Sequence, residues 1–140
     1  NNIMSNDWVK DMRDMASKYK IQDAVNNLDR NQLRSFLHFR VNFLQEELDE
    51  LKKATHRGIP IDSEETVDAL IDLCVVAIGT LDLFDVNAYE AWNEVLEANM
   101  GKEVGVKETR PNPDGLPDLI KPKNWKAPNH TGNHGKLSGL

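Results

Sequence analysis

Acidic residues interrupt a long apolar run near the middle of the chain, and this combination restricts the fold more than any other feature. Residues 67–84 are mostly Val, Leu, Ile and Ala, yet Asp68 and Asp72 stand among them. A helix through this run is apolar on nearly every side, which is typical of a helix in the middle of a bundle. Asp68 and Asp72, four residues apart, then project from one face of that helix.

Helical signals extend over most of the first hundred residues. Asp29, Asp62 and Asn87 are good N-cap residues before amphipathic or apolar runs, and Gly58 and Gly101 follow two of these runs. Alternation of apolar and polar residues is sustained nowhere, so we expect no β-sheet. The sequence predicts an all-α bundle of about four helices, over residues 5–20, 29–55, 62–84 and 87–100.

The residues after Gly101 differ in composition. Five of the six prolines lie between Arg110 and Pro128, mixed with Asn, Gly, Asp and Lys, so this segment does not form a helix. Because it also contains Leu, Ile and Trp125, we expect an extended strap on the bundle or on a neighbouring subunit, with disorder beyond Pro128. We therefore divide the chain into a helical domain, 1–102, and an extended proline-rich tail, 103–140.

The apolar helix also predicts an assembly of identical subunits. Its apolar circumference is larger than the neighbouring helices of one subunit can easily cover. A symmetric assembly buries such a surface, so we expect a homodimer or a homotetramer.

A second acidic cluster precedes the apolar run. Glu46-Glu47-x-x-Glu50 lies on the predicted helix 29–55, where Glu47 and Glu50 project from one face. A buried carboxylate without a partner is costly, and hard divalent cations are common partners of clustered carboxylates. The two clusters therefore predict a Mg²⁺ site, in which Mn²⁺ could substitute, formed by Glu47, Glu50, Asp68 and Asp72.

Three interpretations of these carboxylates compete. Most acidic runs on helices are solvated faces without a ligand, although the apolar neighbours of Asp72 fit that interpretation poorly. A di-iron or di-manganese bundle uses Glu-x-x-His motifs, and the sequence has none. A magnesium cluster that orders a polyphosphate and activates water needs only carboxylates and positive side chains, and the sequence fits this interpretation best.

Charge and cysteine content exclude several classes of partner. The net charge of -6, without a basic cluster, argues against a nucleic-acid polymer. The apolar run is too short and too charged to cross a bilayer, so we expect no membrane partner. Cys74 is the single cysteine and can form no internal disulfide, and its apolar neighbours predict that it is buried. We expect a cytoplasmic protein.

The acidic motifs together resemble a known superfamily. Glu46-Glu47-x-x-Glu50 with the downstream Asp72 is similar to the signature of the all-α nucleoside triphosphate pyrophosphatases, with their MazG-like and phosphoribosyl-ATP pyrophosphohydrolase-like branches. The similarity to the second branch continues through residues 67–73, 79–81 and 94–102. It includes the Asn-x-x-Lys motif of that branch, at Asn99 and Lys102.

One position departs from the superfamily signature. The family usually has Glu three residues before the Asp, where this chain has Ala69, and the acidic group stands at Asp68 instead. A helix keeps both spacings on the same side, so Asp68 could substitute as a metal ligand with a shorter side chain.

The resemblance implies a reaction and roles for these residues. Water attacks the α-phosphorus of a nucleoside triphosphate, and pyrophosphate leaves. The implied metal ligands are Glu47, Glu50 and Asp72, with Asp68 as a further ligand, while Glu46 holds or deprotonates the attacking water. The implied nucleotide contacts are Asn99 and Lys102. Arg40 lies two turns before Glu47, where it either reaches the same phosphates or forms a surface salt bridge.

We therefore predict magnesium-dependent hydrolysis of a (deoxy)nucleoside triphosphate to the monophosphate and pyrophosphate. Two alternatives stay open. One is the hydrolysis of phosphoribosyl-ATP. The other is a non-enzymatic helical adaptor, whose acidic face and proline-rich tail would dock partner proteins.

Overall fold

The computed structural model describes residues 4–110 and 112–140, and these divide into two compact units. The first unit comprises the chain up to Ala88 together with His134–Leu140, and the second comprises Tyr89–Asn133. These units are groups of residues that lie close together in space. The domains 1–102 and 103–140 rest on composition and resemblance, so the units do not test them and they stay a prediction.

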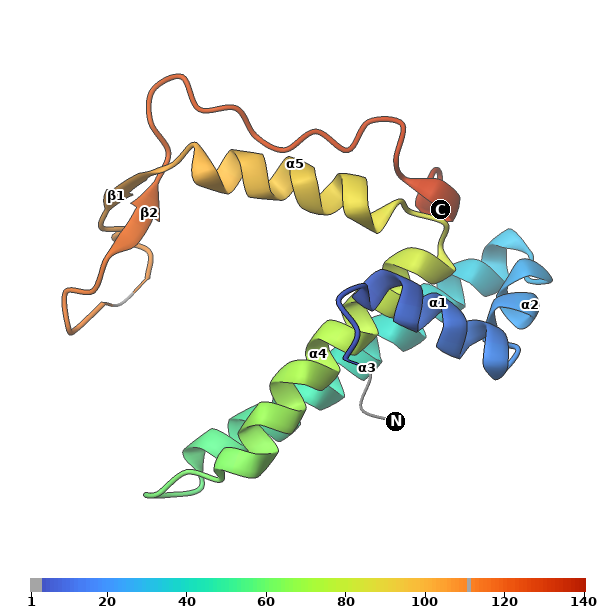
Figure 1. Cartoon of the computed structure of the whole chain (residues 1–140), viewed down its shortest axis with the longest axis horizontal. Coiled ribbons are helices and arrows are strands. Elements are labelled where there is room, and N and C mark those ends of the chain that lie inside the picture. Colours follow the sequence, from blue (N-terminus) through green and yellow to red (C-terminus); the bar gives the residue numbers. More distant parts are fainter. Residues whose placement is uncertain (1–3, 111) are drawn as a thin grey trace. The chain divides into compact units, whose positions relative to one another are not determined.

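Four helices form the described part of the first unit (Figure 1): α1 (Trp8–Lys18), α2 (Ile21–Asn26), α3 (Arg30–His56) and α4 (Ser63–Leu83). Lys20 has a positive φ of 58° and separates α1 from α2. The helix predicted over residues 5–20 is confirmed as α1, whereas α2 was not predicted. The caps predicted at Asp29 and Asp62 are confirmed. Asp29 forms a capping box with Gln32, and the Asp62 carboxylate accepts a hydrogen bond from the Glu65 N–H.

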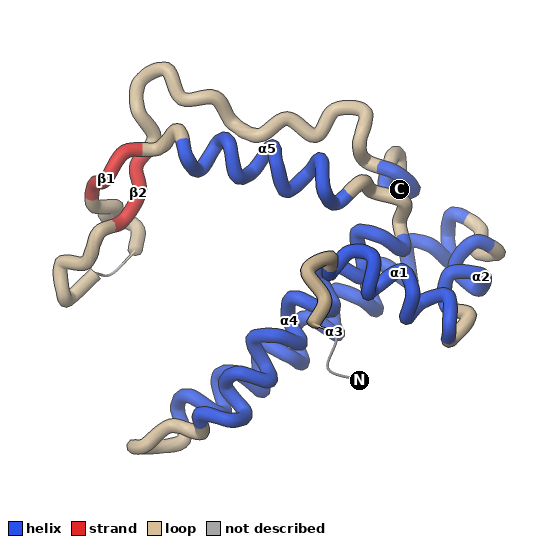
Figure 2. Tube along the Cα trace, in the orientation of Figure 1, coloured by secondary structure: helices blue, strands red, loops and turns tan. Residues whose placement is uncertain are grey.

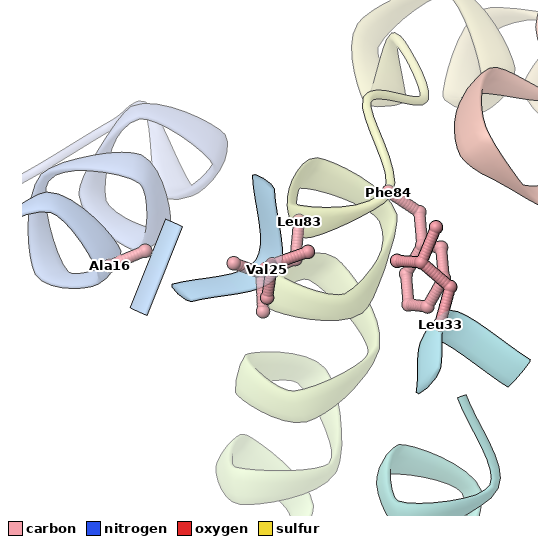
Figure 3. Packing of buried hydrophobic residues seen from close by; sticks show 5 residues of the cluster. All are labelled: Ala16, Val25, Leu33, Leu83 and Phe84. Carbon is pink, nitrogen blue, oxygen red and sulfur yellow. The ribbon is translucent and has the colours of Figure 1, made fainter. Parts of the chain in front are cut away.

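The two long helices, α3 and α4, run antiparallel beside each other, and α1 packs on α4 (Figure 2). A partly buried ion pair anchors α1, because Arg13 lies 2.7 Å from Asp82, whose side chain is only 7% exposed. The main apolar cluster lies where these helices and α2 meet (Figure 3), and its buried members are Ala16, Val25, Leu33, Leu83 and Phe84.

One side of α4 has no cover from the described residues of the first unit. Its main neighbours are α3 and α1, and Val67, Leu70, Ile71 and Cys74 are exposed. The prediction that Cys74 is buried is therefore wrong for the single chain. A helix that is apolar all round needs more neighbours than these two helices provide.

The second unit combines α5 (Ala88–Met100) with a two-stranded antiparallel sheet, β1 (Glu103–Gly105) and β2 (Asp118–Ile120). The prediction of no sheet is wrong, because strands of three residues are too short to show alternation in the sequence. After β2 the chain returns along α5 (Figure 2). There Trp125 Nε1–H donates to the Ala98 carbonyl over 2.6 Å, and the Asn129 N–H donates to Glu94 over 2.9 Å.

The last seven residues rejoin the first unit. They contain a 3₁₀ helix (Gly135–Leu137), and the Lys136 N–H donates to the Phe84 carbonyl over 2.7 Å. Leu137 and Leu140 pack against the apolar cluster. The prediction of disorder beyond Pro128 is therefore wrong. Across the residues that the structure describes, no helix is both long and apolar enough to span a membrane.

Candidate functional site

The helix pair α3 and α4 carries the predicted acidic site residues, and Glu47 is the most buried of them. Its side chain is 9% exposed, and its Oε2 is buried without a hydrogen-bond partner among the described residues. Burial raises the pKa of Glu47, and the carboxylates of Glu50, Asp72 and Asp68 raise it further. The sequence pointed to Asp72 as the carboxylate with the least access to water. The structure shows that this carboxylate is Glu47, on the facing helix.

Asp72 lies on α4 and is partly buried. Its pKa is raised first by burial and then by the charges of Asp68 and Glu50. Carboxylates on α3 and α4 thus raise one another's pKa across the helix pair, as expected where the acidic faces of two helices lie opposite each other. The remaining predicted members of the cluster, Glu46, Glu50 and Asp68, are exposed.

Neighbouring carboxylates raise the pKa of Glu47 and Asp72, but among the described residues the side chains of this cluster are not arranged as a complete metal site. In the ranges 4–110 and 112–140, no group of three or more His, Cys, Asp or Glu side chains is positioned to hold a metal ion. The donor chemistry nevertheless suits a hard cation. An unpartnered buried carboxylate oxygen, with like charges around it, is stabilised when a divalent cation binds.

Arg40 occupies the same helix pair and has contacts that its sequence did not suggest. Its Nε donates to the Thr80 hydroxyl over 2.9 Å, and its Nη2 donates to the Val76 carbonyl over 3.1 Å. Burial lowers the pKa of Arg40. A Cβ at Gly79 would lie 3.0 Å from Nη2, so the glycine leaves room for the guanidinium.

The surface salt bridge considered for Arg40 is absent, because the described carboxylates form no ion pair with it. The guanidinium instead ties α3 to α4 through neutral oxygens. A half-buried cation without an anion is electrostatically unsatisfied, so it is suited to an incoming phosphate.

The remaining predicted residues lie in the second unit. Asn99 is exposed near the end of α5. Lys102 follows the helix and lies over the Trp125 ring, with its Nζ 5.5 Å from the ring centre. The hydrogen bond from Trp125 to Ala98 confirms that this tryptophan packs against the helix. The structure adds Lys121, whose Nζ lies 4.8 Å from the centre of the same ring.

A groove of about 710 Å³ also lies along α5 in the second unit. Its lining includes Trp125, three acidic residues, Glu94, Glu97 and Glu103, and two basic residues, Lys123 and Lys126. Acidic residues outnumber basic ones in this lining, so the groove offers a polyphosphate no excess of positive charge.

A comparison with protein families identifies the helical part of the chain. The family model for phosphoribosyl-ATP pyrophosphohydrolase matches residues 18–99, more than half of the 140 residues. The chain belongs to the phosphoribosyl-ATP pyrophosphohydrolase family. This family is part of the MazG-like all-α nucleoside triphosphate pyrophosphatase superfamily, so the resemblance predicted from the motifs is confirmed. Neither a curated protein nor a solved structure matches the chain.

The phosphoribosyl-ATP pyrophosphohydrolase match includes both long helices and almost all of α5. All the predicted metal ligands and Asn99 lie within it, whereas Lys102, Lys121 and Trp125 lie beyond its end. Membership in this family indicates a pyrophosphohydrolase that acts on a nucleotide.

Proposed function

We propose that this protein hydrolyses a (deoxy)nucleoside triphosphate to the monophosphate and pyrophosphate, with Mg²⁺ as its cofactor. The observation that carries the proposal is the buried Glu47 Oε2, which has no partner among the described residues and lies in a cluster of carboxylates. Such an oxygen is suited to a divalent cation, and a nucleotide pyrophosphohydrolase needs positive charge beside its phosphates.

The roles follow from this chemistry. Glu47, Glu50 and Asp72, with Asp68, would hold the metal, which supplies charge neutralisation at the phosphates and lowers the pKa of a bound water. The oxygen of a water molecule bonds to the α-phosphorus, the bond from that phosphorus to the α,β-bridging oxygen breaks, and pyrophosphate leaves. Glu46 is exposed and free to take the proton of the attacking water.

Positive and polar side chains would bind the rest of the nucleotide. Arg40 would offer its remaining N–H groups to a phosphate, since its known contacts engage only Nε and Nη2. Lys102 would contact phosphate as a point charge, and Asn99 would donate or accept a hydrogen bond.

Hydrolysis of phosphoribosyl-ATP is an equally supported second candidate, because the matching family model describes that activity. The bond broken is again a phosphoric anhydride with pyrophosphate as the leaving group. The same carboxylates and cations would therefore serve either substrate, and the choice depends on contacts to the base and sugar.

A substrate panel tests the proposal. Purified protein is incubated with Mg²⁺ and with canonical, deoxy and modified triphosphates and phosphoribosyl-ATP, and pyrophosphate release is measured. We expect release from at least one triphosphate, and a decrease of about 100-fold or more in Glu47→Ala and Asp72→Ala. Asp49→Ala is the matched control, because Asp49 is an exposed acid on the same helix.

The panel also separates the rival functions. Release from phosphoribosyl-ATP alone would select the second candidate. No release from any compound would leave the non-enzymatic adaptor, and full activity in both alanine variants would show that these carboxylates are not the catalytic site.

We also propose that the protein works as a homodimer or a homotetramer. The exposed apolar side chains on α4 support this, since Val67, Leu70 and Ile71 flank the acidic residues of that helix. A second copy that covers this face would also exclude water from the neighbouring carboxylates.

A further inference from the structure

Two lysines meet at one end of the small sheet in the second unit. The β1–β2 register pairs Glu103 with Ile120 at one end of the sheet, and Lys102 and Lys121 are the chain neighbours of these two residues just outside the strands. The ammonium groups of both lysines also lie over the ring of Trp125, at 5.5 Å and 4.8 Å from its centre. The end of the sheet and the shared ring thus bring both cations to the same tryptophan.

No carboxylate in the described chain neutralises this pair. Neither Lys102 nor Lys121 forms an ion pair with a described residue, although Arg110 and Asp118 do so in the same unit, at 2.6 Å. Two ammonium groups beside one ring repel each other. An anion that bridges the two ammonium groups would remove this repulsion.

Trp125 is well placed to fix the position of both lysines. Its Nε1–H donates to the Ala98 carbonyl over 2.6 Å, which holds the indole against the end of α5. The face of an indole ring attracts ammonium groups. The ring therefore links the two lysines to α5, the helix that also carries Asn99.

We propose that Lys102 and Lys121 form one phosphate-binding site for the polyphosphate of the nucleotide, with Trp125 as the positioning residue. The identity of the anion rests on the proposed function. A triphosphate or a pyrophosphate carries several negative charges, and two ammonium groups held on one ring can neutralise more of them than a single lysine. Lys121 thereby becomes a binding residue in a segment beyond the family match.

The test compares Lys121→Ala with Lys123→Ala, a control two residues along the same segment that lies in the acidic groove. Binding of inorganic pyrophosphate with Mg²⁺ is measured by titration calorimetry, and KM and kcat are measured with the best triphosphate. We expect Lys121→Ala to weaken pyrophosphate binding and raise KM about tenfold, with a smaller change in kcat. Lys121→Arg should restore binding, and Lys123→Ala should match the wild type.

A second measurement separates the effect of the Lys121 charge on pyrophosphate binding from an effect of the substitution on packing. The affinity of the wild type for pyrophosphate should fall more steeply with salt than that of Lys121→Ala, because one charge contact is missing in the variant. Trp125→Phe keeps a ring but loses the hydrogen bond to Ala98, so we expect an intermediate loss of affinity. Circular dichroism of each variant checks that the helices are retained.

The outcomes distinguish this site from the proposed function. Equal pyrophosphate binding by Lys121→Ala and the wild type, or equal losses in Lys121→Ala and Lys123→Ala, would overturn the phosphate site even if triphosphates are hydrolysed. Loss of pyrophosphate binding in Lys121→Ala, in a protein that hydrolyses no nucleotide, would support the site and reject the enzyme.

Discussion

At the scale of single residues, the buried charge of Glu47 suits the proposed metal binding but lowers the stability of the metal-free protein. Its buried carboxylate has one oxygen without a partner in the described chain, and three neighbouring carboxylates raise its pKa beyond the effect of burial. A raised pKa means that the folded state disfavours the charged form, so at neutral pH this charge lowers the stability of the metal-free protein. A bound cation would reverse that effect.

We predict that Glu47→Gln stabilises the metal-free protein at neutral pH by on the order of 1 kcal/mol, because the amide removes a buried charge and its repulsion. Thermal unfolding in a chelator measures this difference. Addition of millimolar Mg²⁺ should raise the Tm of the wild type and leave the variant nearly unchanged. The exposed neighbour provides the control, since Glu46→Gln should keep the wild-type stability. A Glu47→Gln variant less stable than the wild type in chelator would contradict this account of the cluster.

At the scale of elements, the 3₁₀ helix shows how a short segment can be fixed by one backbone contact. The Lys136 N–H donates to the Phe84 carbonyl at the end of α4, and Lys136 Nζ lies 2.6 Å from the side-chain oxygen of Asn26. Gly135 allows this approach, because it has a φ of 52° and no side chain beside Phe84. The first unit therefore holds the chain just before and just after the second unit.

We predict that Gly135→Ala releases the C-terminal segment, because a Cβ there would overlap the Phe84 carbonyl oxygen. The loss of stability should be about 2–3 kcal/mol, from strain at positive φ together with lost packing. Gly132→Ala is the matched control. Gly132 also has a positive φ, of 80°, but no atom lies within 4 Å of its added Cβ, so only about 1 kcal/mol should be lost. Urea unfolding measures both values, and equal losses would contradict the docking role of Gly135.

At the scale of the whole molecule, each of the two units has a helix with exposed apolar side chains. Val67, Leu70 and Ile71 on α4 are exposed, as are Trp92 and Met100 on α5. Clusters of exposed apolar side chains of this kind mark surfaces that bind a partner. These exposed apolar side chains support the proposed assembly of identical subunits.

We predict that the protein sediments as a homodimer or a homotetramer of its 15.9 kDa chain, in analytical ultracentrifugation. Leu70→Gln should shift the equilibrium toward the monomer by about tenfold or more, because a polar side chain would replace an apolar one at the interface. Lys53→Gln, at an exposed position on α3, should leave the equilibrium unchanged. A monomeric wild type at micromolar concentration would reject the assembly.

The sequence by itself determined the elements that depend on residues close together in the chain. Helical periodicity located α3 and α4, and Asp29 and Asp62 marked their starts, because a cap and a hydrophobic stripe involve residues only a few positions apart. The spacing of the acidic motif was equally local. Together with residues 67–73, 79–81 and 94–102, this motif resembles the superfamily that the comparison confirmed.

Only the tertiary structure decided which groups are buried and which distant residues meet. Among the predicted metal ligands, it placed Glu47 rather than Asp72 in the least accessible position, and it tied Arg40 to α4. It also paired strands too short to show a period, and it brought Lys102 and Lys121 to the ring of Trp125. These features depend on contacts between residues far apart in the chain, and such contacts leave no repeating pattern in the sequence that forms them.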